Sequence, residues 1–158
     1  MKGAGKTNAM RILEVRGIPF STAAYPCAEP IDGVTVAERI GAPVETVYKT
    51  LVTCGKTGAY IVFIVPAAAE LDLKKAAAAA GEKSVVMIPV KEITPVTGYV
   101  RGGCSPVGMK KQYATYIDGS AKGKYSIYVS AGRLGEQLKL SPNDIIAVTG
   151  GQYADLAI

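Results

Sequence analysis

The stretch RGGCSPVGMKK places a thiol and a hydroxyl side by side, Cys104 and Ser105, in a glycine-rich turn. Gly102 and Gly103 allow backbone angles that other residues avoid and let N–H groups approach a ligand, while Pro106 stiffens the turn. Such a loop can cradle an anion or the oxygen atoms of a substrate. Gly-Gly and Ser-Pro pairs more often form a purely structural turn. This stretch alone therefore does not decide between a structural turn and a loop that binds a substrate.

The chain of 158 residues contains no histidine. This removes Ser-His-Asp and Cys-His catalysis together with the usual mixed-ligand zinc sites. Its three cysteines, Cys27, Cys54 and Cys104, have no CxxC spacing, so they indicate neither a disulfide framework nor a metal site. We therefore expect no metal and no cofactor. A thiol hydrolase centred on Cys104 is a weaker alternative, because its base would have to be a lysine or a carboxylate.

Lys49 stands in the stretch TVYKTL, between the apolar residues Val47 and Leu51, which should point into a core. One interpretation is a lysine whose stem covers the core while its ammonium reaches water. The other is a cation at the mouth of a pocket, held by rigid elements on either side, that binds a phosphate or a carbonyl oxygen.

The charge balance favours an anionic partner. Lysine and arginine outnumber aspartate and glutamate by 18 to 13, a formal net charge of +5, which suits nucleic acid or nucleotide. The longest apolar run, from Ala59 to Ala69, is interrupted by Pro66 and is shorter than the roughly 20 residues of a membrane span. The N-terminal residues have no apolar core followed by a cleavage site, so we expect a cytoplasmic protein without a membrane contact.

Local signals predict the elements that would position these residues. Capping residues, prolines and glycines predict helices from Thr7 to about Arg16, two short ones meeting near Gly41-Ala42-Pro43, one from Asp72 to Ala80, one near Val90 to Ile93 and one from Ser141 to Gly150. Alternating and β-branched runs predict strands at Phe20–Tyr25, TLVTC, AYIVFIV, Ser84–Ile88, Gln112–Asp118, Tyr125–Ser130 and Tyr153–Ile158.

Two strand pairs follow from these runs: a hairpin of TLVTC with AYIVFIV, and a pair formed by Gln112–Asp118 with Tyr125–Ser130. The mixture predicts a single α+β domain over residues 1–158, with a mixed, barrel-like β-sheet flanked by helices.

Five segments in register resemble one family. VYKTL, ELDLKK with the alanine-rich run after it, TGYVRGGCSPVGMKK, IYVSAG and SPNDI are similar to the YbaK/EbsC group of aminoacyl-tRNA deacylases, which is related to the editing domain of bacterial prolyl-tRNA synthetase. The resemblance implies a YbaK-like fold and hydrolysis of the ester in a misacylated tRNA, with Cys-tRNA(Pro) as the first candidate. It also implies tRNA(Pro) and prolyl-tRNA synthetase as partners, and a mechanism that uses groups of the substrate in place of a protein nucleophile.

By position, Lys49 matches the family's essential lysine, Gly102 and Pro106 its G-x-x-x-P loop, and Tyr25 its substrate-pocket tyrosine. Gln137 stands where cysteine-specific members carry an aspartate, which leaves the amino-acid specificity open; the neighbouring Glu136 is an alternative source of the acidic group.

We therefore expect Lys49 to hold the terminal nucleotide or the aminoacyl group, and the backbone N–H groups from Gly102 through Gly103 and Cys104 to Ser105 to stabilise the oxyanion. Lys110 and Lys111 are candidates for the tRNA backbone, although two solvated lysines are the plainer interpretation. A non-catalytic tRNA- or synthetase-binding module with the same fold is the alternative function.

Overall fold

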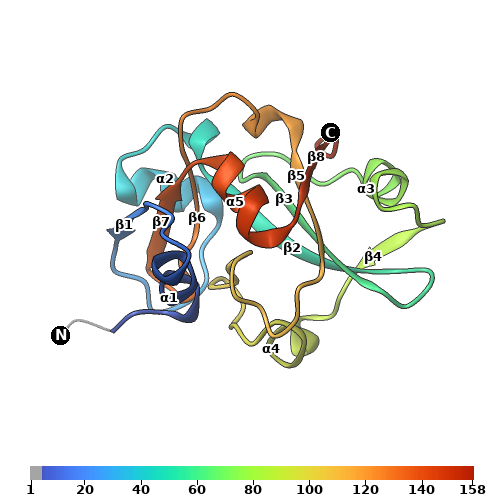
Figure 1. Cartoon of the computed structure of the whole chain (residues 1–158), viewed down its shortest axis with the longest axis horizontal. Helices are drawn as coiled ribbons and strands as arrows, with labels where there is room; N and C mark the ends of the chain where they lie inside the picture. Colours follow the sequence, from blue (N-terminus) through green and yellow to red (C-terminus); the bar gives the residue numbers. More distant parts are fainter. Residues whose placement is uncertain (1–4) are drawn as a thin grey trace.

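The computed structural model describes residues 5–158, so the first four residues of the expected domain lie outside the described part of the chain. Figure 1 shows strands and helices mixed along the chain, with strands β1, β7 and β6 at one end of the molecule and helix α3 at the other.

All helices except α4 begin and end close to where local capping predicts. They are α1 (Asn8–Val15), α2 (Gly33–Ile40), α3 (Leu73–Ala80), α4 (Val90–Thr97) and α5 (Pro142–Thr149), with short 3₁₀ turns η1 (Val44–Thr46) and η2 (Gly119–Ala121). The Thr7 hydroxyl accepts a hydrogen bond from the Met10 N–H, and Asp72 does the same for Lys74 and Lys75. Each such cap stabilises its helix by about 1 kcal/mol, so the chain locally determines these boundaries.

Helix α4 is longer than the sequence predicts, because it continues through Pro95 to Thr97. A proline removes its own N–H donor and crowds the carbonyl four residues before it, but the residues after it can still bond backwards. The Thr97 hydroxyl donates to the Ile93 carbonyl at 2.7 Å, and the Gly98 N–H donates to the Thr94 carbonyl at 2.8 Å. These bonds carry the helix past the expected end at Ile93.

Within residues 5–158 the strands form two sheets. The five-stranded sheet has the order β4-β2-β3-β5-β8, and the three-stranded sheet has the order β1-β7-β6. The strands are β1 (Ser21–Ala24), β2 (Tyr48–Gly55), β3 (Tyr60–Pro66), β4 (Val85–Met87), β5 (Ala114–Asp118), β6 (Ile127–Ser130), β7 (Glu136–Leu140) and β8 (Gln152–Ala154). β2 and β3 form the predicted hairpin, whereas β5 runs parallel to β3 and to β8, so the larger sheet is mixed.

The predicted pairing of β5 with β6 is wrong. β6 pairs with β7 in the small sheet, while β5 lies between β3 and β8 in the large one. Asp118, at the end of β5, accepts hydrogen bonds from the N–H groups of Ser120, Leu156 and Ala157. Its carboxylate thus ties the end of β5 to the C-terminal segment beside it, while the turn η2 leads the chain away to the other sheet.

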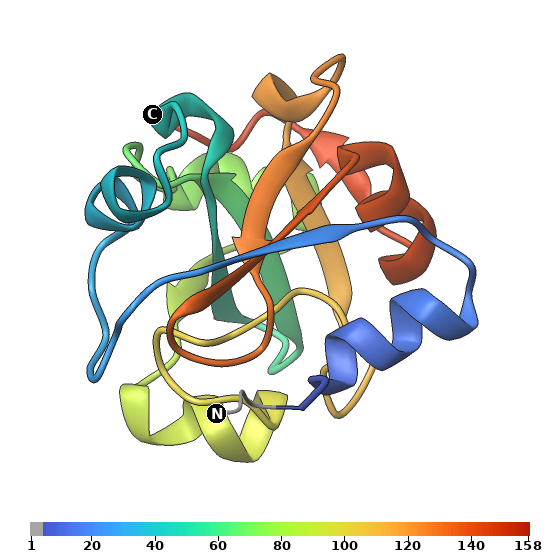
Figure 2. The same ribbon diagram turned by 90° about the vertical axis from the view of Figure 1, so that its left-hand side faces the viewer.

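The two sheets meet where β2 passes β6, through a parallel bridge between Val47 and Tyr128. Figure 2 shows the smaller sheet crossing in front of β2 and β3. Buried side chains of both sheets, including Ile64, Ile127 and Leu138, form one core with α1 and α5. The α+β class and the mixed sheet are confirmed, but the sheets do not close into a barrel. No helix in residues 5–158 has both the length and the apolar character that crossing a bilayer requires.

Candidate functional site

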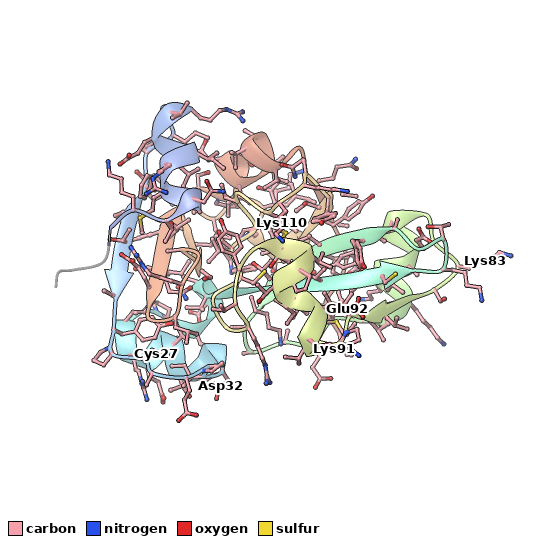
Figure 3. All side chains as sticks on the ribbon, turned by 90° about the horizontal axis from the view of Figure 1, so that it is seen from below. Cys27, Asp32, Lys83, Lys91, Glu92 and Lys110 are labelled. Atoms are coloured by element: carbon pink, nitrogen blue, oxygen red, sulfur yellow. The ribbon has the colours of Figure 1, made fainter. Side chains whose placement is uncertain are left out.

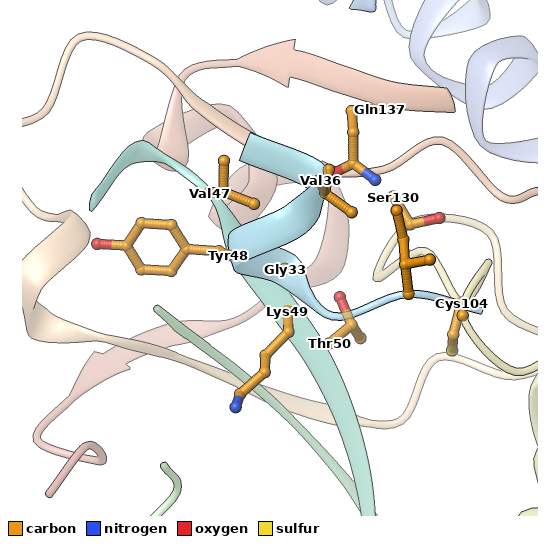
Figure 4. A pocket seen from close by; sticks show the side chains of 11 residues that line it. Gly33, Val36, Val47, Tyr48, Lys49, Thr50, Cys104, Ser130 and Gln137 are labelled. Carbon is orange, nitrogen blue, oxygen red and sulfur yellow. The ribbon is translucent and has the colours of Figure 1, made fainter. Parts of the chain in front are cut away.

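A small cavity opens where α2, the start of β2, the small sheet and the loop after α4 converge (Figure 4). Its volume is about 130 Å³. The lining residues are Ile31, Gly33, Val36, Val47, Tyr48, Lys49, Thr50, Gly102, Cys104, Ser130 and Gln137. Four residues singled out from the sequence, Lys49, Gly102, Cys104 and Gln137, therefore meet here.

Helix α2 covers the cavity because its first residue is a glycine. A Cβ atom on Gly33 would lie 2.2 Å from the Cβ of Ala67, so any other residue would push the helix away from the end of β3. Asp32 caps the helix by accepting a hydrogen bond from the Thr35 N–H at 2.8 Å. The hydrogen bonds from Thr35 lower the pKa of the Asp32 carboxyl, which keeps the cap ionised at neutral pH.

Lys49 borders the cavity near the start of β2, opposite Val65 of β3. It is half-buried, and within residues 5–158 its ammonium has neither an ion pair nor a hydrogen bond. In Figure 4 the ammonium points away from Gln137 and Cys104. Lys49 is thus an uncommitted cation at the edge of the cavity.

Thr50 lies on the other face of β2, since successive residues of a strand point to opposite sides. It pairs with Ile64, which belongs to the core between the sheets, whereas Lys49 pairs with Val65, which packs toward α3. The Thr50 hydroxyl oxygen is buried and has no hydrogen-bond partner; among the described residues no other buried side-chain nitrogen or oxygen lacks one.

Gln137 reaches the cavity from β7, where it pairs with Ala23 of β1 and Ser130 of β6. It is 6% exposed, and its amide donates to the Tyr25 hydroxyl at 3.5 Å. Burial raises the pKa of Tyr25, so the phenol stays protonated. Tyr25 therefore lies behind Gln137 and supports it, without lining the cavity itself.

Glu136 does not line the cavity. Its carboxylate receives the Nε–H of Arg133 at 2.7 Å, in an ion pair that is mostly shielded from solvent. The acidic side chain next to Gln137 is therefore engaged elsewhere, and the polar group that β7 presents to the cavity is a neutral amide.

The loop after α4 contributes backbone to the cavity wall. Gly102 has a φ of +82°, and a Cβ there would lie 2.9 Å from the Pro30 Cβ and 3.0 Å from Leu134. A Cβ on Gly103 would lie 2.9 Å from the Arg133 backbone. The Gly103 N–H donates to the Val100 carbonyl at 2.9 Å and is therefore committed to the turn. Within the described chain the N–H groups of Gly102, Cys104 and Ser105 have no acceptor. Gly102 and Cys104 line the cavity and offer it free donors, whereas Gly103 and the fully buried Ser105 do not line it.

Neither Cys104 nor Ser105 has an activating partner. Burial raises the pKa of the Cys104 thiol to about 11, and the hydrogen-bonding neighbour is the Thr97 hydroxyl, which is not a base at neutral pH. Ser105 is fully buried, and its hydroxyl accepts the Val107 N–H at 3.2 Å. A nucleophile needs an adjacent base or a lowered pKa, and this loop provides neither.

Three other predicted residues lie outside the cavity. Pro106 is buried behind the loop, and Lys110 and Lys111 are exposed. Figure 3 shows Lys110 beside α4, and the stem of Lys110 lies close to Gly98 at the end of that helix. Residues 5–158 contain no group of three or more cysteine, aspartate or glutamate side chains placed to hold a metal ion.

Sequence reasoning missed most of the apolar wall and the unpaired hydroxyl. Val36, Val47 and Ile31 look like ordinary core residues in the sequence, and only the tertiary structure brings them to one cavity. The sequence gives only a weak indication that Thr50 belongs to the site, namely that it is a polar residue next to Lys49.

Comparison with known proteins decides the family. The model of the aminoacyl-tRNA editing domain matches residues 29–148, which include α2, the cavity and the glycine-rich loop. The chain belongs to this family. The editing domain is 43% identical over 152 residues to EbsC of Enterococcus faecalis, named as a proposed Cys-tRNA(Pro)/Cys-tRNA(Cys) deacylase, and the match covers 96% of this chain and 93% of that protein.

Solved structures agree with the fold of the editing domain. A proposed trans-editing enzyme for prolyl-tRNA synthetase superposes with a TM-score of 0.84 at 28% identity, over 98% of this chain and 99% of the other. The hypothetical protein APE2540 superposes with a TM-score of 0.86 over 96% of this chain and 100% of its own. Its identity of 22% supports the fold alone.

Proposed function

We propose that this editing domain hydrolyses the ester of a misacylated tRNA as a freestanding enzyme, with Cys-tRNA(Pro) as its first substrate. The name of the E. faecalis relative supports the choice of substrate, and that of the solved trans-editing protein supports tRNA and prolyl-tRNA synthetase as partners. The observation that carries the proposal is the cavity, where an uncommitted cation, free backbone N–H donors and a buried amide meet around a space of about 130 Å³.

The chemistry assigned to the cavity is electrostatic. Water adds to the ester carbonyl carbon, the ester C–O bond breaks, and the free amino acid and the terminal hydroxyl of the tRNA leave. The free N–H groups of Gly102 and Cys104, the two loop residues that line the cavity, are assigned to the oxyanion that develops on the carbonyl oxygen. One such donor contributes about 3 kcal/mol to the transition state.

Lys49 holds the terminal nucleotide or the aminoacyl group in this proposal. Its flexible stem allows the ammonium to turn toward a bound anion or carbonyl, and no protein group competes for it within the described chain. Gln137, held by Tyr25, shapes the part of the cavity that receives the amino-acid side chain.

The attacking group is water and not a side chain of the protein. Cys104 has a pKa of about 11, Ser105 is buried with its hydroxyl engaged, and the chain has no histidine. A proton acceptor on the substrate itself fits a site of this composition.

The deciding experiment is a panel of tRNA(Pro) charged with Cys, Ala, Ser or Thr, together with Cys-tRNA(Cys), each incubated with substoichiometric protein. Release of amino acid over many turnovers is expected for at least one of them, with Cys-tRNA(Pro) the fastest. A mobility shift without turnover would identify the non-catalytic tRNA-binding module instead.

We also place the editing domain across the whole of residues 1–158, beyond the matched 29–148. Thr7 at the start of α1 donates to the Ala131 carbonyl near β6, and the C-terminal residues are tied to Asp118 of β5. The segments before and after the matched residues therefore pack against the two sheets of the editing domain. A cytoplasmic location follows from a substrate that belongs to translation.

A further inference from the structure

A second hollow adjoins the cavity on the side of α4. Its volume is about 360 Å³, nearly three times that of the first, and the two share Thr50, Gly102 and Cys104 in their walls. The rest of its lining comes from β2, the end of β4 and the residue after it, α4 and the loop after α4, and consists of Leu51, Val52, Met87, Ile88, Val90, Ile93 and Arg101. We call this hollow the apolar groove.

The apolar groove exposes large apolar side chains to solvent. Met87 is 45% exposed and Val90 is 54% exposed, although both are large apolar side chains beside a concave surface. Arg101 is the one charged residue in the groove's lining, and within residues 5–158 it has no ion pair or side-chain hydrogen bond. The groove thus combines an apolar wall with a single free cation at its rim.

Thr50 lies at the junction of the two hollows with its hydroxyl oxygen buried and unpaired. Buried polar groups in folded proteins are almost always hydrogen-bonded, so an unpaired one calls for a partner that is absent from the free protein. In Figure 4 this hydroxyl points toward the inside of the cavity. A ligand that extends from the cavity into the groove would pass this oxygen.

We propose that the apolar groove binds the terminal nucleoside of the tRNA. The aminoacyl group occupies the smaller cavity, a ribose hydroxyl bonds to Thr50 at the junction, and the base packs against Met87 and the neighbouring aliphatic side chains. Arg101 binds the 5′ phosphate of that nucleotide. Nucleobases have apolar faces that pack on such side chains, sulfur contacts aromatic rings favourably, and the guanidinium geometry matches phosphate.

This inference rests on the proposed function, because it assigns the rest of the same substrate. The volumes support the assignment: the smaller hollow suits a side chain of the size of cysteine, and the larger one is left for the bulkier nucleoside.

The activity test compares two adjacent residues of β4. Met87 lines the groove, whereas Val86 is 59% exposed, does not line it, and points to the other side of the strand. Both sites are exposed enough to accept aspartate without unfolding. Met87→Asp is expected to lower kcat/KM for Cys-tRNA(Pro) at least about tenfold, and Val86→Asp to change it less than about twofold. The loss in Met87→Asp should be much smaller for cysteine ethyl ester, which has no nucleoside, and Val86→Asp should leave the hydrolysis of both substrates nearly unchanged.

Equal effects of the two variants on the charged tRNA, or an equal loss of Met87→Asp on both substrates, would overturn the assignment. So would an effect of Met87→Asp seen only in the presence of prolyl-tRNA synthetase, which would make the groove a protein interface. If the wild type releases amino acid from no charged tRNA, the proposed function fails, and the binding test below still decides the groove.

The binding test uses AMP as the probe and the methyl signal of Met87, one of four methionines, as the reporter in NMR titration. AMP is expected to shift this signal saturably, and Arg101→Ala to weaken AMP binding at least about fivefold while leaving adenosine binding unchanged. An unmoved Met87 signal, or equal AMP affinity in Arg101→Ala, contradicts the proposal.

Thr50→Val tests the junction, because it keeps the shape of the side chain and removes the unpaired hydroxyl. The variant should be at least as stable as the wild type and should bind adenosine more weakly. Unchanged adenosine affinity would exclude the hydroxyl from the nucleoside site.

Discussion

Lys49 is the residue on which the proposed chemistry depends most, since among residues 5–158 no other cationic side chain borders the smaller cavity. Lys49→Ala is expected to lower kcat/KM for deacylation at least about a hundredfold, the scale of losing one important transition-state contact. The fold should persist, because the ammonium has no partner within the described chain whose loss would matter. Lys56→Ala, at an exposed site in the turn between β2 and β3, is the matched control. Turnover near that of the wild type would remove Lys49 from the site.

Cys104 lines the cavity without acting as a nucleophile, and its pKa makes this testable. With a pKa of about 11, four units above pH 7, only about one thiol in ten thousand is ionised at neutral pH. Burial disfavours the thiolate, so its fraction would rise tenfold with each pH unit throughout the range from pH 6 to 9. Cys104→Ala should therefore keep most activity, and wild type and variant should have the same pH–rate profile over this range. An inactive variant, or an acylated Cys104 trapped by mass spectrometry, would establish a thiol enzyme.

The glycine-rich loop is tested at the scale of the element, with a second glycine as its control. Gly102 and Gly58 both have positive φ, +82° and +92°, so replacing either by alanine strains the backbone by about 1–2 kcal/mol. A Cβ on Gly58 meets nothing within 4 Å, whereas one on Gly102 meets Pro30 and Leu134 beside the cavity. The contact with Pro30 should lower the melting temperature of Gly102→Ala more than that of Gly58→Ala. Single-turnover deacylation, measured well below both melting temperatures, should fall far more in Gly102→Ala than in Gly58→Ala. Similar activity in both would mean that the loop is only a turn.

The strand pairings show what local sequence patterns leave open. The hairpin of β2 with β3 was predicted correctly, because a four-residue turn joins two neighbouring runs. The pairing of β5 with β6 was predicted by the same proximity and is wrong, because β3 and β8 occupy the two edges of β5 and Asp118 ties its end to the C-terminal residues. A short stretch of sequence around residue 118 does not include residues 156 and 157, so local patterns cannot predict these contacts.

At the scale of the whole molecule, the net charge of +5 predicts how recognition of tRNA responds to salt. If lysines and arginines such as Lys110, Lys111 and Arg101 contact phosphates, binding releases counterions, and log affinity falls by about 0.7–0.9 per contact for each tenfold rise in salt. The KM for charged tRNA should therefore rise steeply between low and moderate salt. Hydrolysis of cysteine ethyl ester under the same conditions is the control and should stay flat. A flat profile for both substrates would confine recognition to the aminoacyl end.

The sequence by itself determined the boundaries of α1, α2, α3 and α5, the absence of histidine chemistry and the family resemblance. Caps and turns act over about four residues, so they can be read in a short window. Tertiary structure alone decided the partners of β5 and β6, the convergence of Lys49, Gly102 and Gln137 on one cavity, and the burial of the unpaired Thr50 hydroxyl. These features depend on which apolar faces cover one another across the whole chain, and no local pattern specifies that choice.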